Sequence, residues 1–200
     1  QKKEKWKWKQ RKTRKITSKN TVNHFDNTEI IHNFANNENE QLKWLNENLD
    51  YIIHQYILKY GNKLDPDEAR KAFIYIGYNG ENVPLFRKVE KELVNKLYDA
   101  MLGEIVKENP TITFLTGVAG SGKSTATRRY SKELNNRGLV YDSALNKYGK
   151  LDKLIKYAQE KGIKDVEVIA VYNDPITAFR NTIARGARND KSLPNGSGRL

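Results

Sequence analysis

Residues 111–125 read Thr-Ile-Thr-Phe-Leu-Thr-Gly-Val-Ala-Gly-Ser-Gly-Lys-Ser-Thr. Ile112, Phe114 and Leu115 give this stretch an apolar start, which indicates a buried strand. The strand runs into Gly-x-x-x-x-Gly-Lys-Ser over residues 117–124, and a helical stretch follows. This pattern is typical of a phosphate-binding P-loop, and the flanking strand and helix are the context that the motif requires. The motif predicts a class of ligand, a nucleoside triphosphate, and leaves the reaction open.

The residue types of the loop suit the binding of ATP and Mg²⁺. Glycines let the backbone curl so that successive N–H groups point toward a phosphate, and the N-terminus of the following helix adds partial positive charge. Lys123 is expected to reach the β- and γ-phosphates, and the Ser124 hydroxyl to ligate Mg²⁺. The predicted nucleotide-binding residues are Gly117, Gly120, Ser121, Gly122, Lys123, Ser124 and Thr125.

Strands and helices alternate after residue 110, which predicts a parallel α/β sheet. The expected elements after the loop are a helix over 123–136, a strand over 139–141, a helix from 151 and a buried, valine-rich strand over 166–172. Asp174-Pro175 is expected to begin a last helix with Ile176, Phe179 and Ile183 on its inner face. The predicted fold is a P-loop NTPase-type parallel sheet flanked by helices.

A helical segment is predicted upstream of the loop. Apolar residues recur at helical spacing over residues 39–60 and 84–107, and Asp65-Pro66 is a good start for a short helix between them. The chain is thus expected to have three parts, namely a basic arm and irregular linker over 1–37, a helical segment over 38–109, and a partial P-loop nucleotide-binding domain over 110–200.

The composition excludes several classes of protein. No apolar run approaches the roughly 20 residues needed to cross a bilayer, so we expect a soluble chain with no membrane partner. The basic N-terminus lacks the apolar stretch of a secretory signal peptide. The absence of cysteine removes disulfides and thiolate metal sites, and the three histidines lack metal-ligand spacing.

Most of the excess positive charge lies in residues 1–15, which carry nine Lys or Arg against one Glu. Such a block repels itself and is not expected to fold alone. It is suited to bind nucleic acid, because its cations neutralise phosphates and its two tryptophans stack on bases. A solvated tail, or a segment that binds an acidic protein surface, is an equally good interpretation. The candidate nucleic-acid-binding residues are Lys5, Trp6, Lys7, Trp8, Lys9, Arg11, Lys12, Arg14 and Lys15.

Asp142 ends a predicted strand, and ligands collect at the carboxyl ends of parallel strands. Its carboxylate is placed to hold Mg²⁺ through water or to act as a base toward a hydroxyl nucleophile. The alternative is a turn or N-cap residue before Ser143. We expect its carboxylate to be open to the cleft.

Arginines follow Asp174 and suit the stabilisation of a transferring phosphoryl group, although solvated helix faces explain most of them. They are Arg180, Arg185, Arg188 and Arg199.

The order of these motifs resembles the zeta-toxin family of P-loop kinases, in particular zeta-like domains embedded in large phage and mobile-element proteins. The resemblance covers about residues 62–200. It rests on the loop, on Tyr-Asp-Ser-Ala-Leu at 141–145, on the valine-rich strand that leads to Asp-Pro at 174–175, and on Arg185 and Gly-Arg at 198–199.

This resemblance implies a kinase that uses ATP and Mg²⁺ to phosphorylate a small hydroxyl substrate, in the best-known members a UDP-linked amino sugar. It implies that Lys123 binds phosphate, that Ser124 ligates the metal, that Asp142 is the acid on the substrate side, and that Arg185 and Arg199 clamp phosphates. It further implies the cytoplasm of a bacterial host or a phage particle as the location.

Two departures from the family pattern leave alternatives open. Ser143-Ala144 follows Asp142 where the relatives usually have Gly-Thr, and only three strands are predicted after Pro110 where such a sheet usually needs about five. We therefore expect this chain to be a stretch of a longer polypeptide. The alternative function is a phage structural or packaging protein that binds nucleic acid through its basic arm and keeps an inactive P-loop domain. A motor or GTPase is disfavoured, because no Asn-Lys-x-Asp motif is present.

Overall fold

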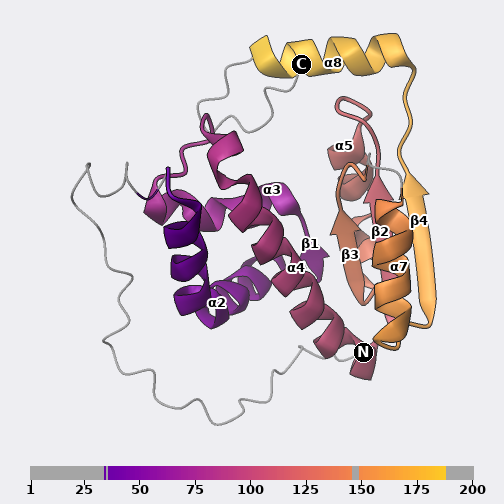
Figure 1. The fold of residues 1–200 in the computed structure, drawn as a ribbon. Coiled ribbons are helices and arrows are strands. Elements are labelled where there is room, and N and C mark those ends of the chain that lie inside the picture. Colours follow the sequence, from indigo (N-terminus) through magenta and orange to yellow (C-terminus); the bar gives the residue numbers. More distant parts are fainter. Residues whose placement is uncertain (1–33, 35, 146–148, 188–200) are drawn as a thin grey trace.

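The computed structural model describes residues 34, 36–145 and 149–187 (Figure 1). In these residues the chain forms a four-stranded, all-parallel sheet flanked by helices, in the strand order β1-β3-β2-β4. The strands are β1 (Lys63–Leu64), β2 (Thr111–Thr116), β3 (Leu139–Asp142) and β4 (Asp165–Ala170). The α/β fold predicted from the sequence is confirmed.

The central strand of this sheet is β2, which carries the P-loop at its carboxyl end. Four of its six residues, from Ile112 to Leu115, are buried, and it pairs with β3 on one side and β4 on the other. The three strands predicted after Pro110 are present. The fourth strand, β1, comes from upstream and adds to the free edge of β3. It was not predicted, because two residues carry no periodicity.

The upstream helices are α2 (Glu38–Tyr60), α3 (Pro66–Ala69), the 3-10 helix η1 (Arg70–Ile76) and α4 (Val83–Glu108). Asp65 caps α3, since its side chain accepts a hydrogen bond from the Asp67 N–H at 3.0 Å, as its sequence context predicts. Residues of α2, η1 and α4 share one apolar core with β2 and β3, through contacts such as the edge-on packing of Tyr98 against Tyr141. The helical segment and the sheet are therefore one packed structure.

After the loop the helices are α5 (Lys123–Arg129), α6 (Ser131–Asn135), α7 (Lys150–Glu160) and α8 (Pro175–Ala187). The single helix predicted over 123–136 is interrupted at Tyr130, whose backbone leaves the helical region. In Figure 1, α8 lies across the end of the sheet toward which the strands point.

Two predictions about burial are wrong. The strand predicted as buried over 166–172 is the edge strand β4, in which Val168 is 44% exposed, because no further strand pairs with its outer side in the described part of the chain. The residues predicted for the inner face of α8, Ile176, Phe179 and Ile183, are all exposed. Ala178 is buried instead, since α8 contacts the P-loop through its small and polar side.

A buried ion pair joins η1 to α4. The Arg70 side chain is 2% exposed and donates two hydrogen bonds to the Glu90 carboxylate, at 2.6 and 2.9 Å. Burial by itself works against the charge of Arg70, but Glu90 outweighs it and raises the pKa of the guanidinium.

We predict that Glu90→Ala strongly destabilises the fold, by about 3–5 kcal/mol, because it leaves the buried Arg70 cation without its main partner. Glu92→Ala on the same helix is the control. Glu92 forms an exposed pair with Lys96 at 3.6 Å, so its loss is expected to cost less than about 0.5 kcal/mol. Urea unfolding of both variants measures the difference, and equal costs would contradict a structural role for the Arg70–Glu90 pair.

Candidate functional site

The backbone between β2 and α5 adopts conformations that favour glycine. Gly120 and Gly122 have φ of 76° and 96°, in the left-handed region, and Gly122 is the N-cap of α5. The first N–H groups of a helix have no partner within it, so the start of α5 offers donors to a ligand. The strand, loop and helix that the sequence predicts are therefore present in the order that the P-loop motif requires.

The loop is packed tightly beneath α8. A Cβ at Gly120 would collide with the carbonyl oxygen of Ala178 and would lie 2.7 Å from Oγ1 of Thr182. Asn181 donates from Nδ2 to the Gly120 carbonyl oxygen at 3.0 Å. The absence of a side chain at position 120 thus allows α8 to approach the loop, a requirement that sequence reasoning did not find.

Two side chains of the loop have hydrogen-bonding capacity available to a ligand. The Lys123 Nζ donates to the Gly117 carbonyl oxygen at 3.1 Å, so its ammonium lies over the loop. The Ser121 side chain is 4% exposed, and its hydroxyl finds no hydrogen-bond partner among the described residues. Buried hydroxyls are seldom left unsatisfied. A phosphate oxygen in the loop would supply the missing acceptor, so these residues fit a bound triphosphate.

Ser124 and Thr125 are exposed in the first turn of α5. In the described part of the chain, no group of three or more His, Asp or Glu side chains could hold a metal ion. Mg²⁺ is usually held by one or two protein ligands together with substrate phosphates and water. A Mg²⁺ site that uses the Ser124 hydroxyl therefore fits this loop without a cluster of carboxylates.

Asp142 ends β3, opposite Leu115 of β2, so it lies at the same edge of the sheet as the P-loop. Its carboxylate is not open to a cleft as predicted. The residue is 9% exposed, and its Oδ2 lies 3.0 Å from the Nζ of Lys63 in β1. The prediction failed because it did not include β1. The following residues are tied to β2, since the Ser143 N–H donates to the Leu115 carbonyl and the Thr116 hydroxyl donates to the Ala144 carbonyl.

Lys63 is the main residue of this site that sequence reasoning missed. It also pairs with Asp65, at 3.4 Å, so one ammonium lies between two carboxylates. Burial tends to lower the pKa of Lys63, but the charges of Asp142 and Asp65 outweigh it and raise that pKa. Burial raises the pKa of Asp65, against the influence of Lys63. A single lysine 79 positions before Asp142 gives no signal in the sequence.

The predicted arginines are only partly placed. Arg180 is exposed on α8. Residue 185 belongs to the same helix, one turn beyond Asn181, which contacts the loop. The side chain of Arg185 and the whole of Arg188 and Arg199 lie outside the described residues, as do the predicted nucleic-acid-binding residues of the arm, residues 5–15. Their roles stay predictions.

No family model matches the chain, and no curated protein matches it in sequence. Among the helices that the structure describes, none combines the length and the apolar character needed to cross a membrane.

We predict that Lys63→Met destabilises the fold by about 2 kcal/mol at pH 7, because it leaves the buried Asp142 and the partly buried Asp65 without their cation. The cost should fall at acid pH, where the Asp65 carboxyl, whose pKa burial raises, binds a proton and needs its cation less. In the wild type, the raised Lys63 pKa contributes to the free energy of unfolding at neutral pH. This contribution is lost only as the pH rises through that pKa, above about 10.4.

The control for this experiment is Lys161→Met, which removes an exposed partner of Asp99 and is expected to have little effect. Urea unfolding at pH 7 and at pH 3.5 measures both variants. A cost for Lys63→Met that does not change between these two pH values would contradict the electrostatic role of Lys63.

Proposed function

We propose that this chain is a P-loop phosphotransferase that binds ATP with Mg²⁺ and transfers the γ-phosphate to a small hydroxyl substrate. The observation that carries the proposal is the loop after β2. Its glycines adopt left-handed conformations, the Lys123 ammonium lies over its backbone, and the buried Ser121 hydroxyl lacks a partner among the described residues. Together these features provide a cation and hydrogen-bond donors for a chain of phosphates.

Each residue of the loop then has a role in holding the nucleotide. Lys123 exchanges its bond with the Gly117 carbonyl for the β- and γ-phosphates, and its positive charge offsets the charge of the transferring group. The Ser121 hydroxyl and the N–H groups at the start of α5 donate to phosphate oxygens. Ser124 ligates Mg²⁺, which when bound neutralises charge on the phosphates.

Asp142 is the proposed base, and this role requires its carboxylate, which is 9% exposed and paired with Lys63, to turn toward the substrate hydroxyl. When the substrate oxygen bonds to the γ-phosphorus and the bond to ADP breaks, the hydroxyl proton passes to the Asp142 carboxylate. The Lys63 ammonium holds this carboxylate at the sheet edge, at 3.0 Å. Resemblance to the zeta-toxin family supports a nucleotide-sugar as the acceptor and Arg185 and Arg199 as phosphate clamps.

We predict that Lys123→Ala lowers ATP affinity at least about tenfold with or without Mg²⁺, because it removes a charge that faces the phosphates. Ser124→Ala should lower affinity only when Mg²⁺ is present. Calorimetric titration measures both, with Lys132→Ala, an exposed residue of α6, as the control for lost charge. Equal ATP affinity in the wild type and Lys123→Ala would contradict the nucleotide site.

Catalysis is tested separately with Asp142→Asn, which keeps the size of the side chain but removes its capacity to accept a proton. Transfer from labelled ATP to a UDP-linked amino sugar is expected to fall about 10²- to 10⁴-fold, while ATP affinity changes little. Asp152→Asn on the exposed side of α7 is the control. Full transfer by Asp142→Asn would contradict the proposed base. A wild-type chain that binds ATP but phosphorylates no sugar would contradict the proposed acceptor.

A further inference from the structure

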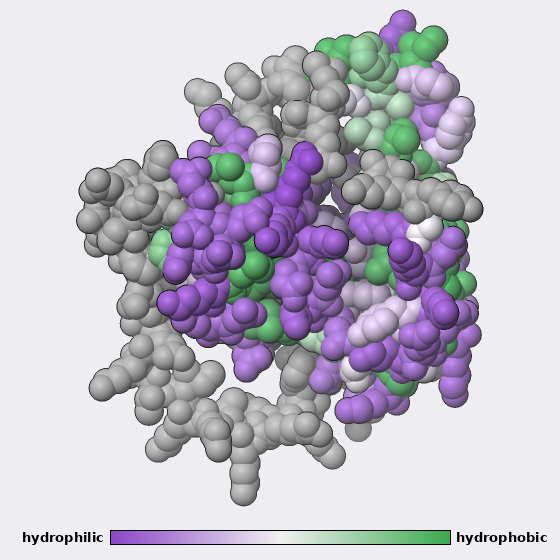
Figure 2. Space-filling model, in the orientation of Figure 1, coloured by the Kyte–Doolittle hydropathy of each residue, from purple (hydrophilic) through white to green (hydrophobic). Residues whose placement is uncertain are grey.

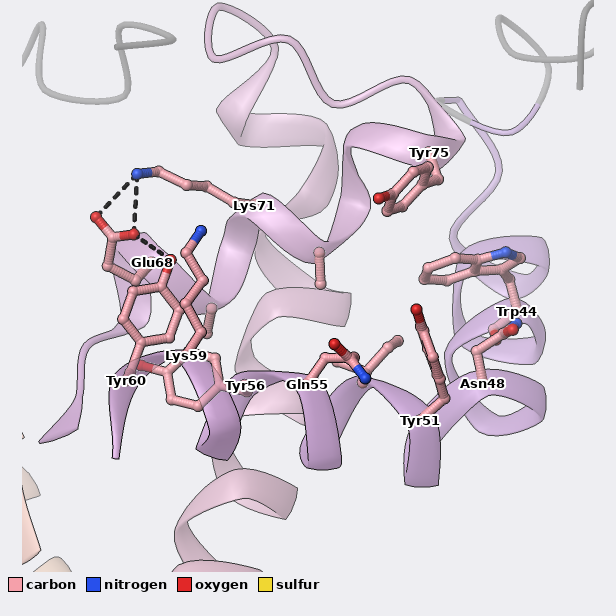
Figure 3. A pocket seen from close by; sticks show the side chains of 13 residues that line it. Trp44, Asn48, Tyr51, Gln55, Tyr56, Lys59, Tyr60, Glu68, Lys71 and Tyr75 are labelled. Carbon is pink, nitrogen blue, oxygen red and sulfur yellow. Dashed lines mark hydrogen bonds and ion pairs between the residues drawn. The ribbon is translucent and has the colours of Figure 1, made fainter. Parts of the chain in front are cut away.

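A cavity of about 220 Å³ lies between α2 and the α3–η1 segment, in the part of the chain that precedes the P-loop strand (Figure 3). None of the residues proposed for the phosphotransferase lines it. Its two ends differ in chemistry, since aromatic rings surround one end and charged groups gather at the other.

The aromatic end is formed by Tyr51 of α2, Tyr75 of η1 and the largely buried Trp44. Tyr51 and Tyr75 are each 50% exposed, and Figure 3 shows the Tyr51 ring rising from α2 toward the segment that carries Tyr75. Large rings exposed on facing walls of one cavity offer flat apolar surfaces to a ligand, and aromatic rings prefer stacked or edge-on partners. This end suits a planar ring.

The charged end holds Lys59, Lys71 and a single carboxylate, Glu68. Lys71 Nζ lies 2.9 Å from both oxygens of Glu68, and the Tyr60 hydroxyl also donates to this carboxylate. Burial alone would raise the pKa of Glu68, but these hydrogen bonds outweigh it and keep the pKa low, so Glu68 is a satisfied anion. Lys59 is exposed, and its ammonium lies 5.0 Å from the centre of the Tyr60 ring. Its charge helps to lower the pKa of Glu68, but no salt bridge joins it to a carboxylate of the described residues.

The Gln55 amide lines the cavity between these two ends, and the Asn48 amide lies at the aromatic end, beside Trp44 (Figure 3). The Asn48 amide nitrogen donates to the Trp44 carbonyl at 2.8 Å, and Gln55 is exposed to solvent. A side-chain amide presents a donor beside an acceptor, the same arrangement that nucleobase edges offer. The cavity therefore combines ring faces, amide groups and an exposed cation.

We propose that this cavity binds a nucleoside monophosphate, with the base between Tyr51 and Tyr75 and the phosphate on Lys59. A cationic ligand is disfavoured, because the lining has two lysines and its one carboxylate is already paired. A polyanionic strand is disfavoured as well, since α2 carries four carboxylates against two lysines and repels extended negative charge. The proposal does not depend on the phosphotransferase activity.

Calorimetric titration of the full chain with AMP and with UMP tests the site. These probes lack the β- and γ-phosphates that the P-loop recognises, so their binding should persist in Lys123→Ala. Tyr51→Ala and Tyr75→Ala should each lower the affinity about tenfold, because each removes a stacking surface. Lys59→Ala should lower it about two- to fivefold, since the cation is exposed to solvent.

Matched controls lie on the same helix. Leu58→Ala and Lys43→Ala change exposed residues of α2 that do not line the cavity, and neither should affect AMP affinity. Adenosine should bind more weakly than AMP, and ribose 5-phosphate should bind more weakly still, because the base supplies most of the contact. Three results would overturn the proposal: binding of AMP and UMP that is lost in Lys123→Ala, equal binding in the tyrosine and control variants, or binding of an oligonucleotide without binding of either monophosphate.

Discussion

The parallel pairing of β2 with both of its neighbours is the constraint on which the rest of this structure depends. Parallel strands place their carboxyl ends at one edge of the sheet, and β2 delivers the glycine-rich loop to that edge. β3 brings Asp142 to the same edge, opposite Leu115, and the chain leaving β4 returns as α8 over the loop. Buried residues on both faces of β2 anchor this arrangement in the core that the sheet shares with α2 and α4.

The Lys63–Asp142 pair connects the upstream helices to this edge. A buried ion pair is often no more stabilising than well-packed apolar residues of similar volume, so stability alone does not explain its presence. It does fix the position of a carboxylate beside the P-loop. A chain of contacts leads from this edge to the cavity between α2 and η1. The Asp65 carboxylate also pairs with Lys63, and the Asp65 backbone exchanges hydrogen bonds with the hydroxyl of Tyr56, a residue that lines the cavity.

Apolar surface gathers at the far edge of the sheet. Val168 of β4 and Ile176, Phe179 and Ile183 of α8 are all at least 44% exposed. Figure 2 shows green, hydrophobic residues over α8, in contrast to the mostly purple surface of α2 and α4 on the same face. Strands of parallel sheets are usually covered on both faces. The central strand β2 is covered in this way, whereas the edge strand β4 leaves Val168 exposed.

The local features of the fold could be predicted from the sequence because each depends on neighbours in the chain. The P-loop, its strand and helix, the capped starts of α3 and α8 and the two long upstream helices follow from residues within a few positions of one another. The curled backbone predicted for the glycines of the loop follows from the same motif, and the structure shows it as left-handed conformations at Gly120 and Gly122.

The sequence by itself therefore determined the strand, loop and helix of the P-loop motif and the strand end at which Asp142 lies. Only the tertiary structure decided that Lys63 pairs with Asp142, that α8 turns its small residues toward Gly120, and that Tyr51 and Tyr75 face one cavity. The physical reason is that burial and ion pairing depend on which surfaces meet. Hydrophobic periodicity gives the face of a helix or strand, but it does not say whether another element covers that face.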